Sequence, residues 1–446
     1  MTRLISILIF VVAPALFAQD TIAIAPLTLG AAARLAAKQN AGPLAAYQRT
    51  QQAHARVGES RAALLPFVEG RGTPQSERTY NTAPLFGFNF ELNGKSLFPP
   101  TGVIIGPAHD ITYEAVAADT LFSFGAIARI RATKASEKAA EADASDQADS
   151  AANAAAATYV RTQAAEALVG ARFADSALAA DLLSIATDQL KAGTGIALDV
   201  TRAQSQLATV RAQLIQARND YDRARLDLLR SLGLPLSAQV TLSDSLSRLP
   251  FLDTLPPEGS AIEDAIRRRR DLRTADLRLD AAEKQISAIR DERLPSFSVA
   301  GAYAADGTRY ENLLRTYNWA LQVSMPIFDG LGRESRLEEQ HAAVREIEVR
   351  RRDLRQKIAI QVRQAYLDLA SARQQVDAAR ERLRLAQQEV DQARDRFRAG
   401  VAGNADVITA SLDLDSARTA EINALQLYHS ARVALANASG AVQDLP

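Results

Sequence analysis

The sequence contains no cysteine among its 446 residues. This absence excludes disulfide bonds, thiolate nucleophiles, zinc–cysteine sites, iron–sulfur clusters and lipid attachment at cysteine. Histidine is also scarce, and the four residues show no metal-ligand spacing: His54, His109, His341 and His429. The sequence contains no evident nucleophile–base pair, phosphate-binding loop or pocket of paired carboxylates. We therefore predict a protein that is not an enzyme and that holds no cofactor or metal.

The chain also lacks a net charge, because 52 Lys and Arg balance 52 Asp and Glu. A neutral chain presents no strong electrostatic field, so nucleic acid is not an expected partner. Aromatic residues make up only 6% of the chain, and much of the 47% apolar fraction is alanine. This composition favours closely packed long helices over a large globular core.

Long hydrophobic runs are almost absent, and the single one covers residues 4–18. Arg3 precedes it, and small apolar residues end it before Gln19, a pattern typical of a secretory signal peptide at 1–18. The run is too short to favour the alternative, a single membrane anchor. No later stretch reaches 18 apolar residues, so the sequence predicts an exported chain that crosses a membrane only as a β-barrel.

What the chain does contain is an internal repeat, with an offset of about 207 residues. The offset relates Gly193 to Gly400 and Asp199 to Asp406. Each half reads as a helix, two strands, a long helix, a short tip and a returning helix. The predicted boundaries are a first repeat at 19–240, with a hairpin at about 66–123 and a tip near 193; a linker at 241–260; and a second repeat at 261–446, with a hairpin at about 295–328 and a tip near 400.

The second long helix is predicted over residues 333–399. Large apolar residues recur there every seven positions, and alanines lie between them, which is a coiled-coil pattern. At about 1.5 Å per residue the helix is roughly 100 Å long. A returning helix over 404–438 is about half as long. We expect one further helix in each half, over 27–65 and 261–294, to cover the remainder of the long helix.

The second hairpin shows a strand period. Tyr317, Trp319, Leu321 and Val323 alternate with small or polar residues, which is typical of a strand with one lipid-compatible face. An ordinary soluble hairpin is the alternative, and the attached long helices favour the membrane strand. Four strands cannot close a barrel, so the sequence predicts that several chains assemble.

These features together resemble the TolC family of outer-membrane efflux channels, over nearly the whole mature chain and once in each half. The motifs that carry the resemblance are LLPF at 64–67, RLPSFS at 293–298, MPIFDGLGRESR at 325–336, and the tips KAGTGIALDVTRAQ at 191–204 and RAGVAGNADVITA at 398–410. Each motif is weak alone, but in this order and duplicated they are specific.

The resemblance implies a mainly α fold with a β-barrel part. Three chains would form a twelve-stranded outer-membrane β-barrel continuous with a long α-helical barrel in the periplasm. It also implies a passive duct, surrounded by outer-membrane lipid, that meets a periplasmic adaptor and a proton-driven or ATP-driven inner-membrane pump. Efflux of small molecules and secretion of proteins both remain open. The alternative of another class is a secreted coiled-coil scaffold with a soluble β cap, which has no need of the apolar strand face.

The resemblance assigns adaptor docking to the exposed tips: Lys191, Gly193, Thr194, Ala399, Gly400 and Val401. Both glycines also suit a helix end, where the left-handed conformation is favoured. The periplasmic entrance is expected at Asp406 and Asp199, where three copies would form carboxylate rings that hold cations. The alternative is that each acid only complements a helix dipole.

The entrance departs from the family pattern at three positions. Thr409 stands where a second acid is common, and Phe397 and Ala402 stand where some members have a tyrosine and an arginine. We therefore expect a weaker cation block and no polar latch of that kind. At the other end, Tyr303, Tyr317 and Trp319 are candidates for an interfacial aromatic belt, with plain strand packing as the alternative. The basic run 267–270 is expected on the helix of the second repeat.

Overall fold

The computed structural model describes residues 23–81, 91–93, 95–96, 104–251 and 256–446. The predicted signal peptide at 1–18 lies outside them. Among the described residues, no helix is both long and apolar enough to cross a membrane. The chain divides into two compact units. The first comprises the described residues within Met1–Tyr47, Asp143–Leu272 and Leu354–Pro446, and the second comprises those within Gln48–Ala142 and Arg273–Asp353.

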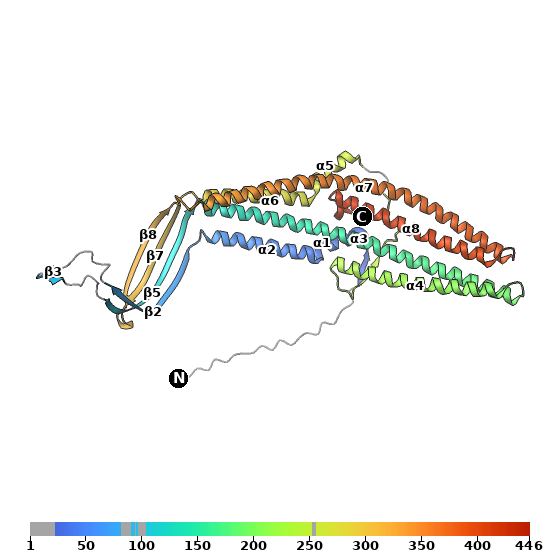
Figure 1. The fold of residues 1–446 in the computed structure, drawn as a ribbon, viewed down its shortest axis with the longest axis horizontal. Coiled ribbons are helices and arrows are strands. Elements are labelled where there is room, and N and C mark those ends of the chain that lie inside the picture. Colours follow the sequence, from blue (N-terminus) through green and yellow to red (C-terminus); the bar gives the residue numbers. More distant parts are fainter. Residues whose placement is uncertain (1–22, 82–90, 94, 97–103, 252–255) are drawn as a thin grey trace, which may run out of the picture. The chain divides into compact units, whose positions relative to one another are not determined.

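The second unit contains an antiparallel sheet in the order β2-β5-β7-β8 (Figure 1). Its strands are β2 (Phe67–Asn81), β5 (Ile104–Ser123), β7 (Ser296–Gly307) and β8 (Leu314–Ser324). Two short strands, β3 (Glu91–Leu92) and β4 (Lys95–Ser96), pair only with each other, and η1 (Tyr310–Asn312) joins β7 to β8. The β5–β7 pairing joins the two sequence repeats, with Ile111 opposite Gly307.

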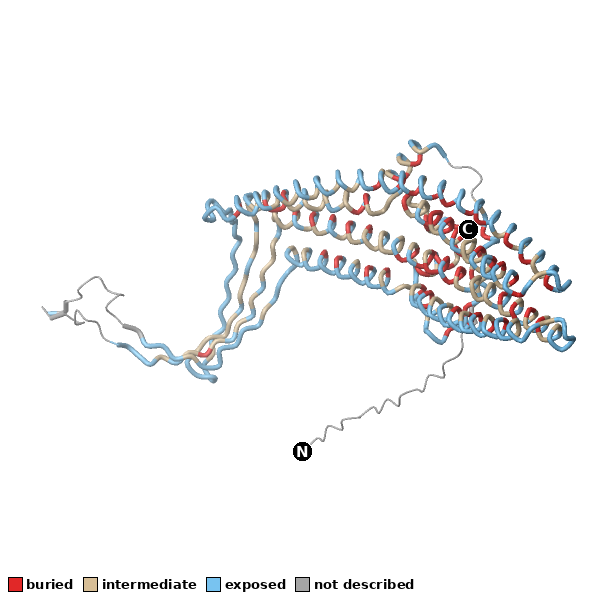
Figure 2. The backbone as a smooth tube through the Cα atoms, turned by 45° about the vertical axis from the view of Figure 1, so that its right-hand side comes forward, coloured by how far each residue is buried: buried red, intermediate tan, exposed pale blue. Residues whose placement is uncertain are grey.

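Both faces of this sheet are largely accessible within one chain. Every residue of β8 is exposed, and Figure 2 shows little buried backbone along the four strands. Within the described sheet, β2 and β8 each pair with a single strand. The sheet therefore leaves two edges with backbone groups that a further strand can pair.

Two long helices run through both units. α3 (Phe124–Lys191) follows β5, and α7 (Gly332–Arg398) follows β8 after a short turn. The predicted heptad row of α7 is buried at Val362, Leu369, Val376 and Val390, and the interleaved alanines are buried at Ala365, Ala372, Ala379 and Ala386. Small and large residues thus alternate along the contact, which lets neighbouring helices approach closely.

The first unit also contains the returning helices α4 (Ala197–Leu232) and α8 (Asn404–Ala438). Around them lie α1 (Leu29–Gln39), α5 (Glu258–Arg268), η2 (Val442–Asp444) and a parallel pair of short strands, β1 (Ala23–Leu27) and β6 (Gln239–Leu242). Tyr159 of α3 is fully buried in the main core, and its hydroxyl donates to the Leu27 carbonyl at 2.7 Å. This hydrogen bond ties β1 to the long helix.

The prediction of single helices over 27–65 and 261–294 is wrong. Each is two helices: α1 is followed by α2 (Ala41–Ala62), and α5 by α6 (Arg270–Asp291). Asn40 separates the first pair in an extended conformation, donates to the Ser231 carbonyl at 2.8 Å and accepts from the Gly42 amide at 2.9 Å. Arg269 separates the second pair, with its guanidinium on Asp271. Hydrogen bonds from side chains to the backbone and to neighbouring acids stabilise these breaks. The spacing of apolar residues along the helix does not indicate such bonds.

The predicted fold class, mainly helical with a small β part, is confirmed by the elements observed. Helices occupy most of the described chain, and the β part consists of short sheets.

Candidate functional site

The first tip joins α3 to α4 through residues 192–196. Gly193 has a φ of 75°, the left-handed conformation that ends many helices. Its amide donates to the Leu190 carbonyl at 3.1 Å, and the Thr194 amide donates to the Gln189 carbonyl at 3.0 Å. Lys191 and Thr194 are exposed. The tip therefore presents polar side chains on a turn whose four amides at 192–195 donate to carbonyls at the end of α3.

The second tip joins α7 to α8 through residues 399–403. Gly400 has a φ of 71°, and its amide donates to the Phe397 carbonyl at 3.0 Å. Ala399, Gly400 and Val401 are exposed, and Val401 is 69% exposed. The two tips share their geometry, but the second one presents only small or apolar side chains.

Two hydrogen bonds connect the tips to each other. Gln189 of α3 donates from Nε2 to the Phe397 carbonyl of α7 at 2.8 Å. Asn404, fully buried at the start of α8, donates from Nδ2 to the Asp199 carbonyl of α4 at 2.8 Å. The Phe397 ring is buried between them, in a cluster with Leu182, Ala186, Ala203 and Val407. Phe397 thus belongs to the packing between the two helical hairpins.

The two predicted entrance acids differ in their surroundings. Asp199 lies in the first turn of α4, where its side chain is only 15% exposed and its Oδ1 lies 3.9 Å from Nη1 of Arg202. Asp406 lies in the first turn of α8 and is exposed. Thr409 is also exposed, but its hydroxyl donates back to the Ala405 carbonyl at 3.0 Å. Asp406 is therefore the more accessible carboxylate at this end.

Farther from the tips, a charged network connects α3 to α8. Asp175 of α3, with a side chain 7% exposed, pairs with Arg418 of α8 and with Arg172, whose Nη1 lies 3.3 Å away. Arg172 also pairs with Asp415, and it donates to the Thr419 hydroxyl at 3.0 Å. Two guanidinium groups and two carboxylates thus balance in a largely buried contact between the sequence repeats.

Sequence reasoning did not find this network. The available signal was the i, i+3 spacing of opposite charges on each helix, Arg172 with Asp175 and Asp415 with Arg418. That spacing is common on exposed helix faces, so the sequence alone does not single it out.

The predicted aromatic belt residues lie on β7 and β8. Tyr303 and Tyr317 are directly opposite each other in the antiparallel register, and Trp319 is opposite Gly301. Their exposed fractions are 51%, 80% and 74%. Leu321 and Val323 are exposed as well, so a row of large side chains lies exposed along one face of β8.

The basic run 267–270 spans the break between α5 and α6. Arg267 pairs with Asp264, and Arg269 pairs with Asp271 at 2.5 Å. Arg270 lies 3.3 Å from Asp149 of α3 and donates to the Ser145 carbonyl at 3.2 Å. The run thus takes part in local ion pairs. In the described part of the chain, no three His, Cys, Asp or Glu side chains form a cluster that could hold a metal ion.

Comparison with known proteins gives a consistent result. A family model described as outer membrane efflux protein matches residues 32–234 and 261–441, one segment in each repeat. The chain is similar to the CyaE protein of Bordetella pertussis, with 28% identity over 277 residues, 60% of this chain and 57% of that protein. It is also similar to the alkaline protease secretion protein AprF of Pseudomonas aeruginosa, with 26% identity over 51% of this chain and 48% of AprF.

The matches thus span about half the length of these two relatives. Among solved structures, the chain resembles the CmeC outer membrane channel of Campylobacter jejuni with a TM-score of 0.74 at 18% identity, over 95% of this chain and 90% of that one. At this identity the likeness concerns the fold.

Proposed function

We propose a function for this chain from the premise that it belongs to the outer membrane efflux protein family. The family places the chain in the bacterial outer membrane, with its helical part in the periplasm. Our proposal is that three copies form a passive channel, which takes substrates from a periplasmic adaptor and an inner-membrane pump to the exterior.

One observation carries this proposal: a four-stranded sheet, whose two edges are unpaired among the described residues, continues directly into helices of 68 and 67 residues. Open edges need a neighbour, and pairing β2 of one copy with β8 of the next satisfies both. Three copies supply twelve strands, enough to close a barrel, whereas the four strands of one chain are too few. The exposed row of large side chains on β8, which includes Tyr317 and Trp319, suits contact with lipid.

At the periplasmic end, we assign adaptor docking to the two exposed tips and cation binding to Asp406. The tips are held by their own backbone bonds and by the Gln189–Phe397 contact, so they offer a preformed surface to a partner. Three copies of the exposed Asp406 would form a carboxylate ring, whereas Asp199 is shielded and close to Arg202.

The experiment is reconstitution of the purified full chain in planar lipid bilayers, with chemical cross-linking of the same preparation. A trimer with discrete single-channel conductance is expected. A protein that remains monodisperse and monomeric without detergent, and that never conducts, would refute the proposal. The transported substrate follows from the pump, so a complementation assay with small-molecule and protein cargo in parallel would distinguish efflux from secretion.

A further inference from the structure

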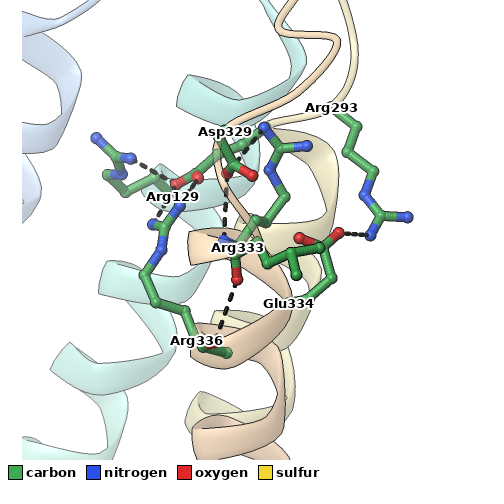
Figure 3. Close-up of polar contacts among 9 residues, drawn as sticks. Arg129, Arg293, Asp329, Arg333, Glu334 and Arg336 are labelled. Atoms are coloured by element: carbon green, nitrogen blue, oxygen red, sulfur yellow. Dashed lines mark hydrogen bonds and ion pairs between the residues drawn. The ribbon is translucent and has the colours of Figure 1, made fainter.

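The junctions where strands meet helices in the second unit carry a network of ion pairs (Figure 3). Glu292, between α6 and β7, accepts from two arginines of different helices. Arg129 of α3 donates from Nη2 at 3.0 Å, and Arg336 of α7 donates from Nη2 at 2.8 Å. One carboxylate therefore serves two guanidinium groups, both of which are about half exposed.

Two further arginines complete the network. Arg293 donates to Glu334 at 2.5 Å, with both side chains about half exposed. Arg333 lies 3.4 Å from Asp329 through Nη2, and its side chain is only 7% exposed. Its Nε has no hydrogen-bond partner among the described residues. The Asp329–Arg333 pair therefore fixes the turn between β8 and α7, whereas the other three arginines stay about half exposed.

The network thus contains four guanidinium groups against three carboxylates, an excess of positive charge in each copy. Large apolar side chains lie beside it, in the turn that leads from β8 to α7. Ile327 is 90% exposed and Phe328 is 78% exposed, and Met325 and Leu331 are exposed as well. Apolar side chains next to arginines match the boundary between the acyl chains and the headgroups of a bilayer.

We propose that the exposed junction arginines, Arg129, Arg293 and Arg336, bind the phosphate groups of the phospholipids around the sheet, while the 325–331 turn contacts their acyl chains. A guanidinium group pairs with phosphate through two parallel hydrogen bonds, which the half-exposed arginines can form without unfolding any element. This inference rests on the proposed location of the sheet in the outer membrane. It adds a fixed lipid site at the periplasmic boundary of that sheet.

The Arg293–Glu334 pair provides a matched test, because both members are exposed and pair only with each other in the network. Arg293→Gln removes a phosphate ligand, whereas Glu334→Gln breaks the same ion pair but frees the guanidinium group. The measurement is the apparent affinity of the detergent-solubilised full chain for phosphatidylglycerol, by native mass spectrometry, with phosphatidylcholine for comparison. We expect Arg293→Gln to weaken binding by roughly two- to fivefold and Glu334→Gln to strengthen it.

Opposite effects of the two substitutions support the lipid site, because a purely structural ion pair would respond alike to the loss of either member. Equal changes, or none, overturn the inference. Displacement of the lipid by an excess of inorganic phosphate alone would also overturn it, because the site would then be one for free anions. Single-channel recordings separate this result from the proposed function. If the chain conducts but neither substitution changes its affinity for lipid, only the lipid site is refuted. If the chain never conducts, the proposed channel function is refuted.

Discussion

Replacing Asp175 with Asn should destabilise the first unit by about 2 kcal/mol, because it leaves two guanidinium groups with a single carboxylate. Asp175 is 7% exposed and pairs with Arg172 and Arg418. Removal of one member of a fully buried pair costs roughly 3–5 kcal/mol. The expected value is lower here, since Arg418 is 22% exposed and can turn toward water, and since Arg172 keeps its contact with Asp415.

The assay is urea denaturation of the detergent-solubilised protein, followed by circular dichroism of the helices. Tryptophan fluorescence is unsuitable, because the single tryptophan, Trp319, lies in the sheet of the other unit. A double-mutant cycle with Arg418→Gln isolates the pair, and the double variant should lose less stability than the sum of the two single variants. Glu381→Gln, which breaks an exposed pair with Arg384, is the control and should leave the midpoint unchanged.

Two results would refute this reasoning. If Asp175→Asn shifts the midpoint no more than Glu381→Gln, the network is solvated and contributes little. If the two substitutions at Asp175 and Arg418 are additive, the side chains act separately and α3 is not held to α8 through them.

Three further predictions concern other parts of the first unit. Asp406→Ala should raise the divalent-cation concentration needed to block the channel in planar bilayers by roughly tenfold, and unchanged block would exclude the carboxylate ring. Gly400→Ala should lower the free energy of unfolding by about 1 kcal/mol, because only its φ of 71° is unfavourable for alanine. Gly233→Ala should lower it by more, because the added Cβ would also lie 2.4 Å from the Gln39 carbonyl oxygen. The melting temperatures of the two variants test this order. Burial lowers the pKa of His429 to about 4, so as the pH falls the unfolded chain binds a proton at this residue before the folded chain does. The free energy of unfolding should therefore fall by roughly 3 kcal/mol as the pH drops from about 6.5 toward 4. A His429→Gln variant should lack that part of the pH dependence.

The long helices and the returning helices could be predicted from the sequence. The heptad row predicted a helix over 333–399, and α7 covers Gly332–Arg398. The repeat predicted two tips with a glycine at each, and both glycines have the left-handed backbone conformation. Such features are local, so the chemistry of the segment itself determines them.

Features that depend on contacts between residues far apart in the sequence could not be predicted from the sequence. Asn40 looks like an ordinary polar residue in a helical stretch, and the helix break appears only with the Ser231 carbonyl in place. The parallel strands β1 and β6 are four or five residues long, and each is stabilised by the other. The tip contacts at Gln189 and Asn404 join the two repeats, and no spacing within one repeat indicates them. The functional roles of the tips and of Asp406 stay predictions.

The pairing of β5 with β7 has a consequence for how the chain reaches its native state. Ile111 pairs with Gly307, so the centre of the sheet forms only once β7 of the second repeat is available. Pairings of this sequence separation form slowly, because the intervening chain must lose entropy before any contact stabilises it. Until then the first hairpin has unpaired backbone groups along β5, and unpaired strand edges of this kind are prone to aggregation. A truncated chain that ends before residue 296 would keep the first hairpin and lose β7 and β8, so it should aggregate more readily than the full chain.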